Sequence, residues 1–111
     1  SLLRHRRHQA RVHVRQGLLA LAQGQPIYEA LTLRLMRRAG LIRADGVATE
    51  TGRAQAARAL LDERRWQLLR ADPRHEAAVA RYDGLTPIET LLTPDQITEL
   101  DRSLAPAGVA P

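Results

Sequence analysis

The stretch that decides the fold is residues 38–54, RAGLIRADGVATETGRA. Within it, Asp45 and Gly46 lie between two short apolar runs, and an Asp-Gly pair in that setting is a strong signal for a tight hairpin turn. We therefore predict a small two-stranded hairpin over 41–49, with Arg43 beside its turn. This hairpin separates a helical part of the chain before it from a helical part after it.

Two helices are predicted before the hairpin. Apolar residues recur at three- and four-residue spacing over 4–23, which is the period of an amphipathic helix. A second helix is predicted over 26–39, because Pro26 suits a first helical position and Gly40 suits the left-handed stop. The residues expected to be buried are Val14, Leu18, Leu21 and Ala22 in the first helix, and Ile27, Ala30, Leu31, Leu35 and Met36 in the second.

The chain after the hairpin is predicted to be helical as well. Thr49 is placed to cap a long helix over 50–70. The residues of this helix available for burial are Ala54, Ala57, Leu60, Leu61, Leu68 and Leu69. Three further helices are predicted where a capping side chain precedes a proline, at Asp72-Pro73, Thr86-Pro87 and Thr93-Pro94.

The order of these elements predicts the fold class. Helix, helix, two-stranded wing and long helix is the order of a winged helix, so we expect a mainly α, winged-helix-like domain with a C-terminal helical extension. The expected organisation is a basic juxtamembrane helix over 1–23, this domain and its extension over 24–104, and a disordered tail over 105–111. The tail is expected because residues 105–111 lack charge and periodicity.

The net charge of +5 comes from the N-terminal part of the chain. Residues 1–28 hold five arginines and no acidic residue, whereas residues 29–111 hold twelve of each. The basic cluster consists of Arg4, Arg6, Arg7, Arg11 and Arg15, with His5, His8 and His13 between them. Basic residues are enriched just cytoplasmic of membrane spans and are attracted to anionic headgroups. We therefore expect this cluster to contact an anionic membrane surface.

The start and the hydropathy of the chain indicate whether it is part of a longer protein and whether it spans a membrane. The chain opens at Ser1 with no initiator Met, so we expect a piece of a longer protein or a processed chain. No apolar run approaches the roughly 20 residues that a membrane span needs. We expect this piece itself to be soluble and, from its basic start, to lie at the cytoplasmic face of a membrane.

Patterns for catalysis and metal binding find little support. Without Cys the chain has no thiolate ligand or cysteine nucleophile, and it has no glycine-rich phosphate loop. His5 and His8 could share a helical face, but the arginines around them repel a divalent cation. A second loose group, expected to cap and solvate a helix, consists of Asp72, His75, Glu76 and Asp83. We expect no enzyme activity, no cofactor and no metal site.

Three stretches resemble bacterial metal-dependent repressors of the diphtheria-toxin-repressor type. Residues 38–54 resemble their GL(I/V)-R strand, turn and LT-x-x-G-R-x-x-A helix start. Residues 62–66, DERRW, resemble their HRLWE stretch, and residues 88–95, IETLLTPD, followed by Leu100, resemble their LEH-x-LTPE…L run. The same stretches follow a basic linker in C-terminal cytoplasmic extensions of manganese, zinc or iron ABC-transporter permeases. This second resemblance covers about residues 30–104.

The permease resemblance implies a non-catalytic regulatory or packing domain on the cytoplasmic side of a bacterial inner membrane. Its implied partners are the transporter's ATPase subunit, a permease twin or a second copy in a homodimer, together with the anionic membrane surface. The metal positions of the repressors hold Glu63, Gln67, Glu89 and Thr90 in this chain. This set lacks imidazole and is therefore a poor site for a transition metal.

The rival interpretation is a stand-alone winged-helix transcriptional regulator or a protein-interaction module. A helix-turn-helix needs two short helices before the wing, and the chain between Leu21 and Gly40 has room for one. Arg34, Arg37 and Arg38 could contact a partner or phosphates, but they also suit the C-terminal end of a solvated helix. The sequence thus argues against specific DNA binding, which is kept as the rival interpretation.

Overall fold

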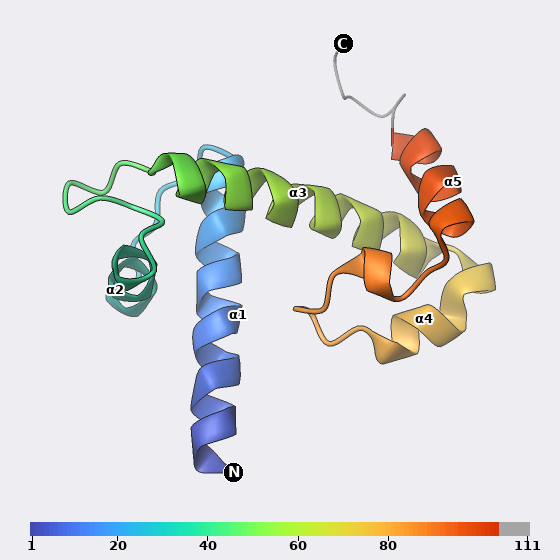
Figure 1. The fold of residues 1–111 in the computed structure, drawn as a ribbon, viewed down its shortest axis with the longest axis horizontal. Coiled ribbons are helices and arrows are strands. Elements are labelled where there is room, and N and C mark those ends of the chain that lie inside the picture. The colour runs from blue at the N-terminus through green and yellow to red at the C-terminus, as the bar shows by residue number, and fades with distance from the viewer. Residues whose placement is uncertain (105–111) are drawn as a thin grey trace. The chain divides into compact units, whose positions relative to one another are not determined.

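The computed structural model describes residues 1–104, which are mainly helical, as the sequence predicts. The elements are α1 (Leu2–Ala22), α2 (Ala30–Arg38), α3 (Glu50–Ala71), η1 (Pro73–His75), α4 (Glu76–Arg81), η2 (Ile88–Thr90) and α5 (Pro94–Leu104) (Figure 1). The tail expected over 105–111 lies outside the described residues.

The chain divides into two compact units within α3. Unit 1 is Ser1–Leu60, and unit 2 begins at Leu61. Each unit has its own apolar core. The expected domain limits after residues 23 and 104 stay predictions.

The core of unit 1 joins α1, α2, the turn segment and the first part of α3. Its buried residues are Leu18, Met36, Leu41, Ile42 and Ala56. Gly17 lies where α1 meets α2, and an added Cβ there would overlap the Met36 sulfur and approach the Thr32 methyl. Gly52 packs directly on the backbone of Leu41, whose carbonyl oxygen occupies the place of a Cβ. Two helix glycines therefore set how closely the elements of unit 1 approach.

The predicted two-stranded wing is wrong. Residues 1–104 contain no strand, and the hairpin is reduced to an isolated antiparallel bridge between Ile42 and Ala48. The turn itself is present, because Gly46 adopts a φ of +85° and its N–H donates to the Arg43 carbonyl. The arms are too short to continue the ladder, and a two-stranded hairpin without a third strand is only marginally stable.

Helix α2 begins at Ala30 and not at Pro26, so the predicted start is wrong. Glu29 is the last residue before the helix and has extended backbone angles, with φ −73° and ψ 121°. Its carboxylate lies 2.7 Å from Nδ1 of His13 on α1. Ile27 packs against the unit 1 core. Because of these contacts with other parts of unit 1, residues 24–29 form a non-helical loop between α1 and α2, although Pro26 by itself suits a helix start.

The predicted burial along α3 is partly wrong. Leu69 is fully buried, but Ala54 and Ala57 are exposed and Leu61 is 40% exposed. Ala56 is buried instead, four residues after Gly52, so these two share the face that meets unit 1. Similarly, Met36 is fully buried in α2 while Leu31 is 37% exposed.

Most of the predicted helix starts are confirmed by their capping bonds. The Thr49 hydroxyl accepts from the Gly52 N–H at 3.0 Å, and Asp72 accepts from the Arg74 N–H at 3.0 Å. Thr93 and Gln96 bond reciprocally, each side chain accepting from the other's backbone N–H. Gly40, with φ +72°, follows α2 as expected.

The predicted cap at Thr86 is wrong. The carboxylate of Asp83 accepts from the N–H groups of Leu85 and Thr86, at 2.9 and 2.7 Å. The N–H of Ile88 donates to Asp62 on α3 at 2.8 Å. Asp62 therefore takes the Ile88 N–H that a Thr86 cap would bind, and the segment forms only the short 3₁₀ helix η2.

Candidate functional site

The basic segment of α1 carries five arginines and no acidic residue: Arg4, Arg6, Arg7, Arg11 and Arg15. The Ser1 hydroxyl starts the helix by accepting from the Arg4 N–H at 3.2 Å. Every residue from 1 to 9 is exposed, as is Arg11, whereas Arg15 is half-buried. The first four arginines of the segment therefore present their charge to the surroundings.

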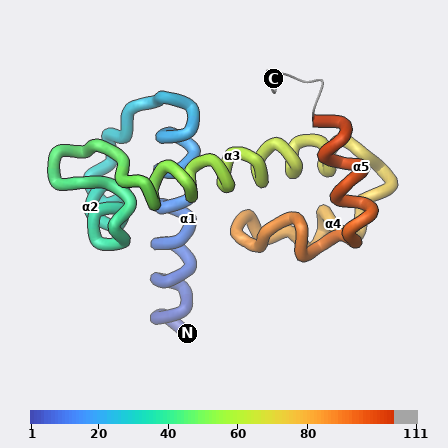
Figure 2. The backbone as a smooth tube through the Cα atoms, turned by 45° about the horizontal axis from the view of Figure 1, so that its top comes forward, coloured from blue at the N-terminus to red at the C-terminus, as the bar shows by residue number. Residues whose placement is uncertain are grey.

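The other end of α1 holds this segment in place. Gly17 and Leu18 are buried, and Val14, Leu21 and Ala22 pack against the unit 1 core. In Figures 1 and 2 the N-terminal turns of α1 extend beyond the part of the helix that lies beside α2. The basic residues thus stand on an anchored helix whose first turns are uncovered.

His13 lies where the exposed and packed parts of α1 meet. Its Nδ1 is 2.7 Å from the Glu29 carboxylate and 3.5 Å from the Thr32 hydroxyl. That hydroxyl also donates to Glu29 at 3.0 Å. His13 therefore links α1 to the start of α2. The described residues contain no group of three or more His, Cys, Asp or Glu side chains placed to hold a metal ion.

The arginines of α2 and of the turn have different surroundings. Arg34, Arg37 and Arg38 are exposed on α2, the last two in its final turn. Arg43 is 63% exposed but donates to the Asp45 carboxylate at 2.7 Å, and the same carboxylate accepts from the Val47 N–H. The charge at the turn is thus largely neutralised, whereas that of α2 is open to a partner.

The residues at the repressors' metal positions are engaged with polar neighbours in unit 2. Gln67 donates to Glu63 at 2.8 Å one turn away on α3. Glu89 lies 3.6 Å from the guanidinium of Arg65. Thr90 donates to the Pro87 carbonyl at 2.7 Å, closing the 3₁₀ turn. A guanidinium beside Glu89 disfavours a cation there, because like charges repel.

Arg65 is the centre of the ion pairs in unit 2. It is only 9% exposed and donates to both carboxylate oxygens of Asp101 at 2.8 Å. The hydrogen bonds to Asp101 raise the pKa of Arg65 above its ordinary value, and the same bonds lower the pKa of Asp101. Sequence reasoning missed this pair, since 36 residues separate its members and no periodicity relates them.

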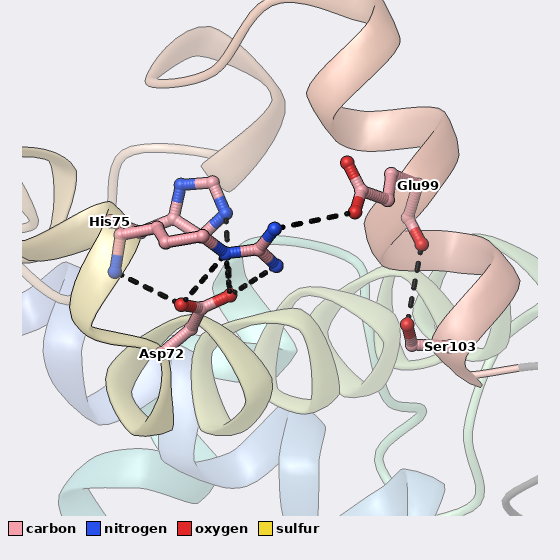
Figure 3. Close-up of polar contacts among 5 residues, drawn as sticks. Asp72, His75, Glu99 and Ser103 are labelled. Carbon is pink, nitrogen blue, oxygen red and sulfur yellow. Dashed lines mark hydrogen bonds and ion pairs between the residues drawn. The ribbon is translucent and has the colours of Figure 1, made fainter.

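A hollow of about 110 Å³ in unit 2 lies between the end of α3 and α5. Asp72 and His75 line it from the segment that follows α3, and Glu99 and Ser103 line it from α5; Figure 3 shows their polar contacts. Arg74 lies between the carboxylates, 2.7 Å from Asp72 and 3.7 Å from Glu99. Its hydrogen bonds lower the pKa of Asp72 to about 2. The guanidinium between these carboxylates disfavours a second cation there, and the carboxylates repel anions.

No helix among the described residues is long and apolar enough to cross a membrane. No protein-family model matches the chain, and neither the curated proteins nor the solved structures give a match.

Proposed function

We propose that the chain is a non-catalytic regulatory or packing domain of a manganese, zinc or iron ABC-transporter permease, lying against the cytoplasmic face of the bacterial inner membrane. The resemblance of 38–54, 62–66 and 88–95 to permease extensions supports the assignment to a transporter. The basic segment supports the proposed location of the domain beside the membrane.

The observation that carries the proposal is the exposure of an acid-free basic helix. Arg4, Arg6, Arg7 and Arg11 are exposed, and no acidic residue occurs before Glu29. Each such charge contributes about 1 kcal/mol to binding at an anionic lipid surface. The repulsion among five arginines disfavours pairing of two copies of this segment, so an anionic occupant suits it best.

Unit 1 also has exposed apolar residues suited to a protein partner. Tyr28 is 87% exposed just before α2, and Leu31 is 37% exposed on it. In our proposal these side chains contact the transporter's ATPase subunit, a permease twin or a second copy of the domain. Arg34 and Arg37 beside them supply charge for the same contact.

The rival function, sequence-specific DNA binding, has less support. Of the described residues between 23 and 40, only 30–38 form a helix, so a two-helix reader of the major groove is not formed there. Arginines on one helix suffice for contact with phosphates but not for readout of bases.

Vesicle sedimentation tests the membrane contact. The chain is expected to bind vesicles containing phosphatidylserine, more weakly as salt rises, and not to bind neutral phosphatidylcholine vesicles. The triple variant Arg4→Ala/Arg7→Ala/Arg11→Ala is expected to bind roughly 100-fold more weakly, since three charges at about 1 kcal/mol each are removed.

A charge-matched variant controls for net charge. Arg58→Ala/Arg64→Ala/Arg102→Ala removes three exposed arginines elsewhere and is expected to bind nearly as the parent does. The membrane contact would be overturned if both variants lost the same amount of vesicle affinity, or if the parent did not bind anionic vesicles. Binding to one duplex sequence in preference to random duplex at the same salt would favour the rival function.

The transporter assignment has its own test, which is the gene sequence upstream of Leu2. Several apolar stretches of about 20 residues there would support a permease, whereas a start codon within a few residues would overturn it.

A further inference from the structure

We infer that Asp45 isomerises spontaneously to isoaspartate, at a rate set by the opening of its turn, and that Asp83 is protected from the same reaction. The chain contains two Asp-Gly pairs, Asp45-Gly46 and Asp83-Gly84. Such pairs favour this reaction, because a glycine has no Cβ to shield its main-chain nitrogen. The inference is independent of the proposed membrane contact, and it follows from how differently the two carboxylates are held.

The reaction needs no reagent other than water. The nitrogen of Gly46 forms a bond to the carboxyl carbon of Asp45, and the hydroxyl of the protonated carboxyl group leaves with the nitrogen's proton as one water molecule. Solvent water then opens the resulting succinimide ring. When it breaks the bond between this nitrogen and the main-chain carbonyl carbon of Asp45, the chain continues through the former side chain. Nothing is oxidised or reduced, and isoaspartate has the same mass as aspartate.

In the closed turn both reacting groups are engaged. The N–H of Gly46 donates to the Arg43 carbonyl at 2.9 Å. The Asp45 carboxylate accepts from the Arg43 guanidinium at 2.7 Å through Oδ2 and from the Val47 N–H at 3.0 Å through Oδ1. While these bonds last, the nitrogen keeps its proton and neither carboxylate oxygen is free to leave. The reaction therefore starts from the opened turn.

The turn can open without disturbing the unit 1 core. All of these bonds join residues within 43–47, and every residue of this segment is exposed, Val47 by 51%. The buried residues Leu41 and Ile42 lie outside it. An exposed ion pair such as that of Arg43 contributes little to stability, and exposed segments with few apolar contacts open at low free energy. The open turn is therefore sampled while the core stays folded.

Asp83 is held by a segment that belongs to the packing of unit 2. Its Oδ1 accepts from the N–H groups of Leu85 and Thr86, at 2.9 and 2.7 Å. Leu85 and Thr86 are half-buried, and Ile88, which follows shortly after, is fully buried in the unit 2 core. The same bonds lower the pKa of this carboxyl to about 2, so the protonated form that loses water is scarce. Asp83 is thus released only when the unit 2 core is disturbed.

The product cannot restore the bonds of the original turn. Isoaspartate adds one methylene group to the main chain between Ala44 and Gly46. Its free carboxylate is the former main-chain carboxyl group, attached directly to Cα without the methylene of the aspartate side chain. The contacts that this carboxylate made with the Arg43 guanidinium and the Val47 N–H are therefore lost. Isomerisation is expected to leave the charge of Arg43 without its partner at the exposed turn.

Peptide analysis of the full chain tests the inference. Trypsin cuts after arginine, so Asp45 falls in peptide 44–53 and Asp83 falls in peptide 82–102. After incubation of the folded chain, isoaspartate in each peptide is measured by methyl transfer from S-adenosylmethionine with an isoaspartate methyltransferase. We expect isoaspartate to form at least about tenfold faster in 44–53 than in 82–102, because only the first site opens without its core.

Urea separates the effect of the fold from that of the sequence. In the unfolded chain neither carboxylate is held, and both aspartates precede a glycine, so the two rates are expected to be similar. Equal rates in the folded chain would overturn the inference. The same would follow if the difference between the two peptides persisted unchanged in urea, since it would then come from the local sequence alone.

Variants of the turn test its control of the rate. Arg43→Gln removes the guanidinium that holds Asp45 and is expected to speed isomerisation about two- to threefold, read in peptide 39–53 because one cleavage site is lost. Arg58→Gln, at an exposed position on α3, removes the same charge outside the turn and should leave the rate unchanged. Asp45→Glu should abolish the signal in 44–53, which assigns it to Asp45. The inference would be overturned if Arg43→Gln reacted no faster than Arg58→Gln, or if Asp45→Glu kept the signal.

Discussion

Arg65 holds Asp101 through two parallel hydrogen bonds, from Nε to Oδ1 and from Nη2 to Oδ2, each 2.8 Å long. The pair joins α3 to α5, and Glu89 adds a third charge 3.6 Å from the same guanidinium. Because Arg65 is almost fully buried, its charge depends on these carboxylates for compensation.

Asp101→Asn is expected to destabilise unit 2 by about 2 kcal/mol, since a buried guanidinium loses a charged, two-pronged acceptor. Urea unfolding followed by the fluorescence of Trp66 measures the change, because the only Trp of the chain lies in unit 2, 4.5 Å from the ring of Tyr82. Asp95→Asn, on the exposed first turn of α5, is the control. It is expected to lower the free energy of unfolding by well under half as much as Asp101→Asn does. Equal losses would show that the pair contributes no more than a surface charge.

Acid is expected to weaken unit 2 through Asp83. Hydrogen bonds from the N–H groups of Thr86 and Leu85 lower the pKa of this carboxyl to about 2 from 3.8. A lowered pKa in the folded state contributes stability above the ordinary value, and this contribution is lost as the pH falls from about 4 to about 2.

The stability difference between the parent and Asp83→Asn should therefore be constant from about pH 7 to 5 and should shrink towards pH 2. Urea midpoints at several pH values, read from Trp66, give this difference. A difference that stays the same down to pH 2 would contradict the assignment.

Gly52→Ala is expected to disrupt unit 1, with a cost of about 3 kcal/mol or more, because the new Cβ would overlap the carbonyl oxygen of Leu41 and backbone must move. Gly17→Ala is the comparison. Its Cβ meets the Met36 side chain and the Thr32 methyl, which can shift, and alanine gains about 1 kcal/mol of helix propensity over glycine. Thermal unfolding by circular dichroism should rank Gly52→Ala as clearly the more damaging, and the reverse order would refute this account.

Thr49→Val is expected to cost about 1 kcal/mol, because the Gly52 N–H and the Gly40 carbonyl lose their partner at the start of α3. Thr49→Ser keeps the hydroxyl and should retain most of the stability. Amide hydrogen exchange at residues 50–53 reports the effect locally. If valine and serine behaved alike, the cap would not be the source of the stability.

Local signals predicted the helices well. The caps at Thr49, Asp72 and Thr93 and the stop at Gly40 depend on residues within a few positions, and the structure has all of them. The Asp45-Gly46 turn also formed, but whether its arms became strands depended on their length and on a third strand to pair with.

Contacts between distant residues account for what the sequence did not predict. Pro26 does not start α2 because His13, from the preceding helix, binds Glu29. Thr86 does not cap η2 because Asp62, from α3, takes the N–H of Ile88. The charge of the basic segment was visible in the composition, whereas its exposure and the anchoring of α1 at Gly17 needed the packing of unit 1.

The chain contains a single sulfur atom, that of Met36, and the structure buries it completely between α1 and α2. Peroxide can oxidise this thioether only when unit 1 opens, and the sulfoxide is polar and does not fit the closed core. The rate at which the protein gains one oxygen atom therefore reports how often unit 1 opens around Met36, where α1 meets α2. Mass spectrometry measures this rate without any label.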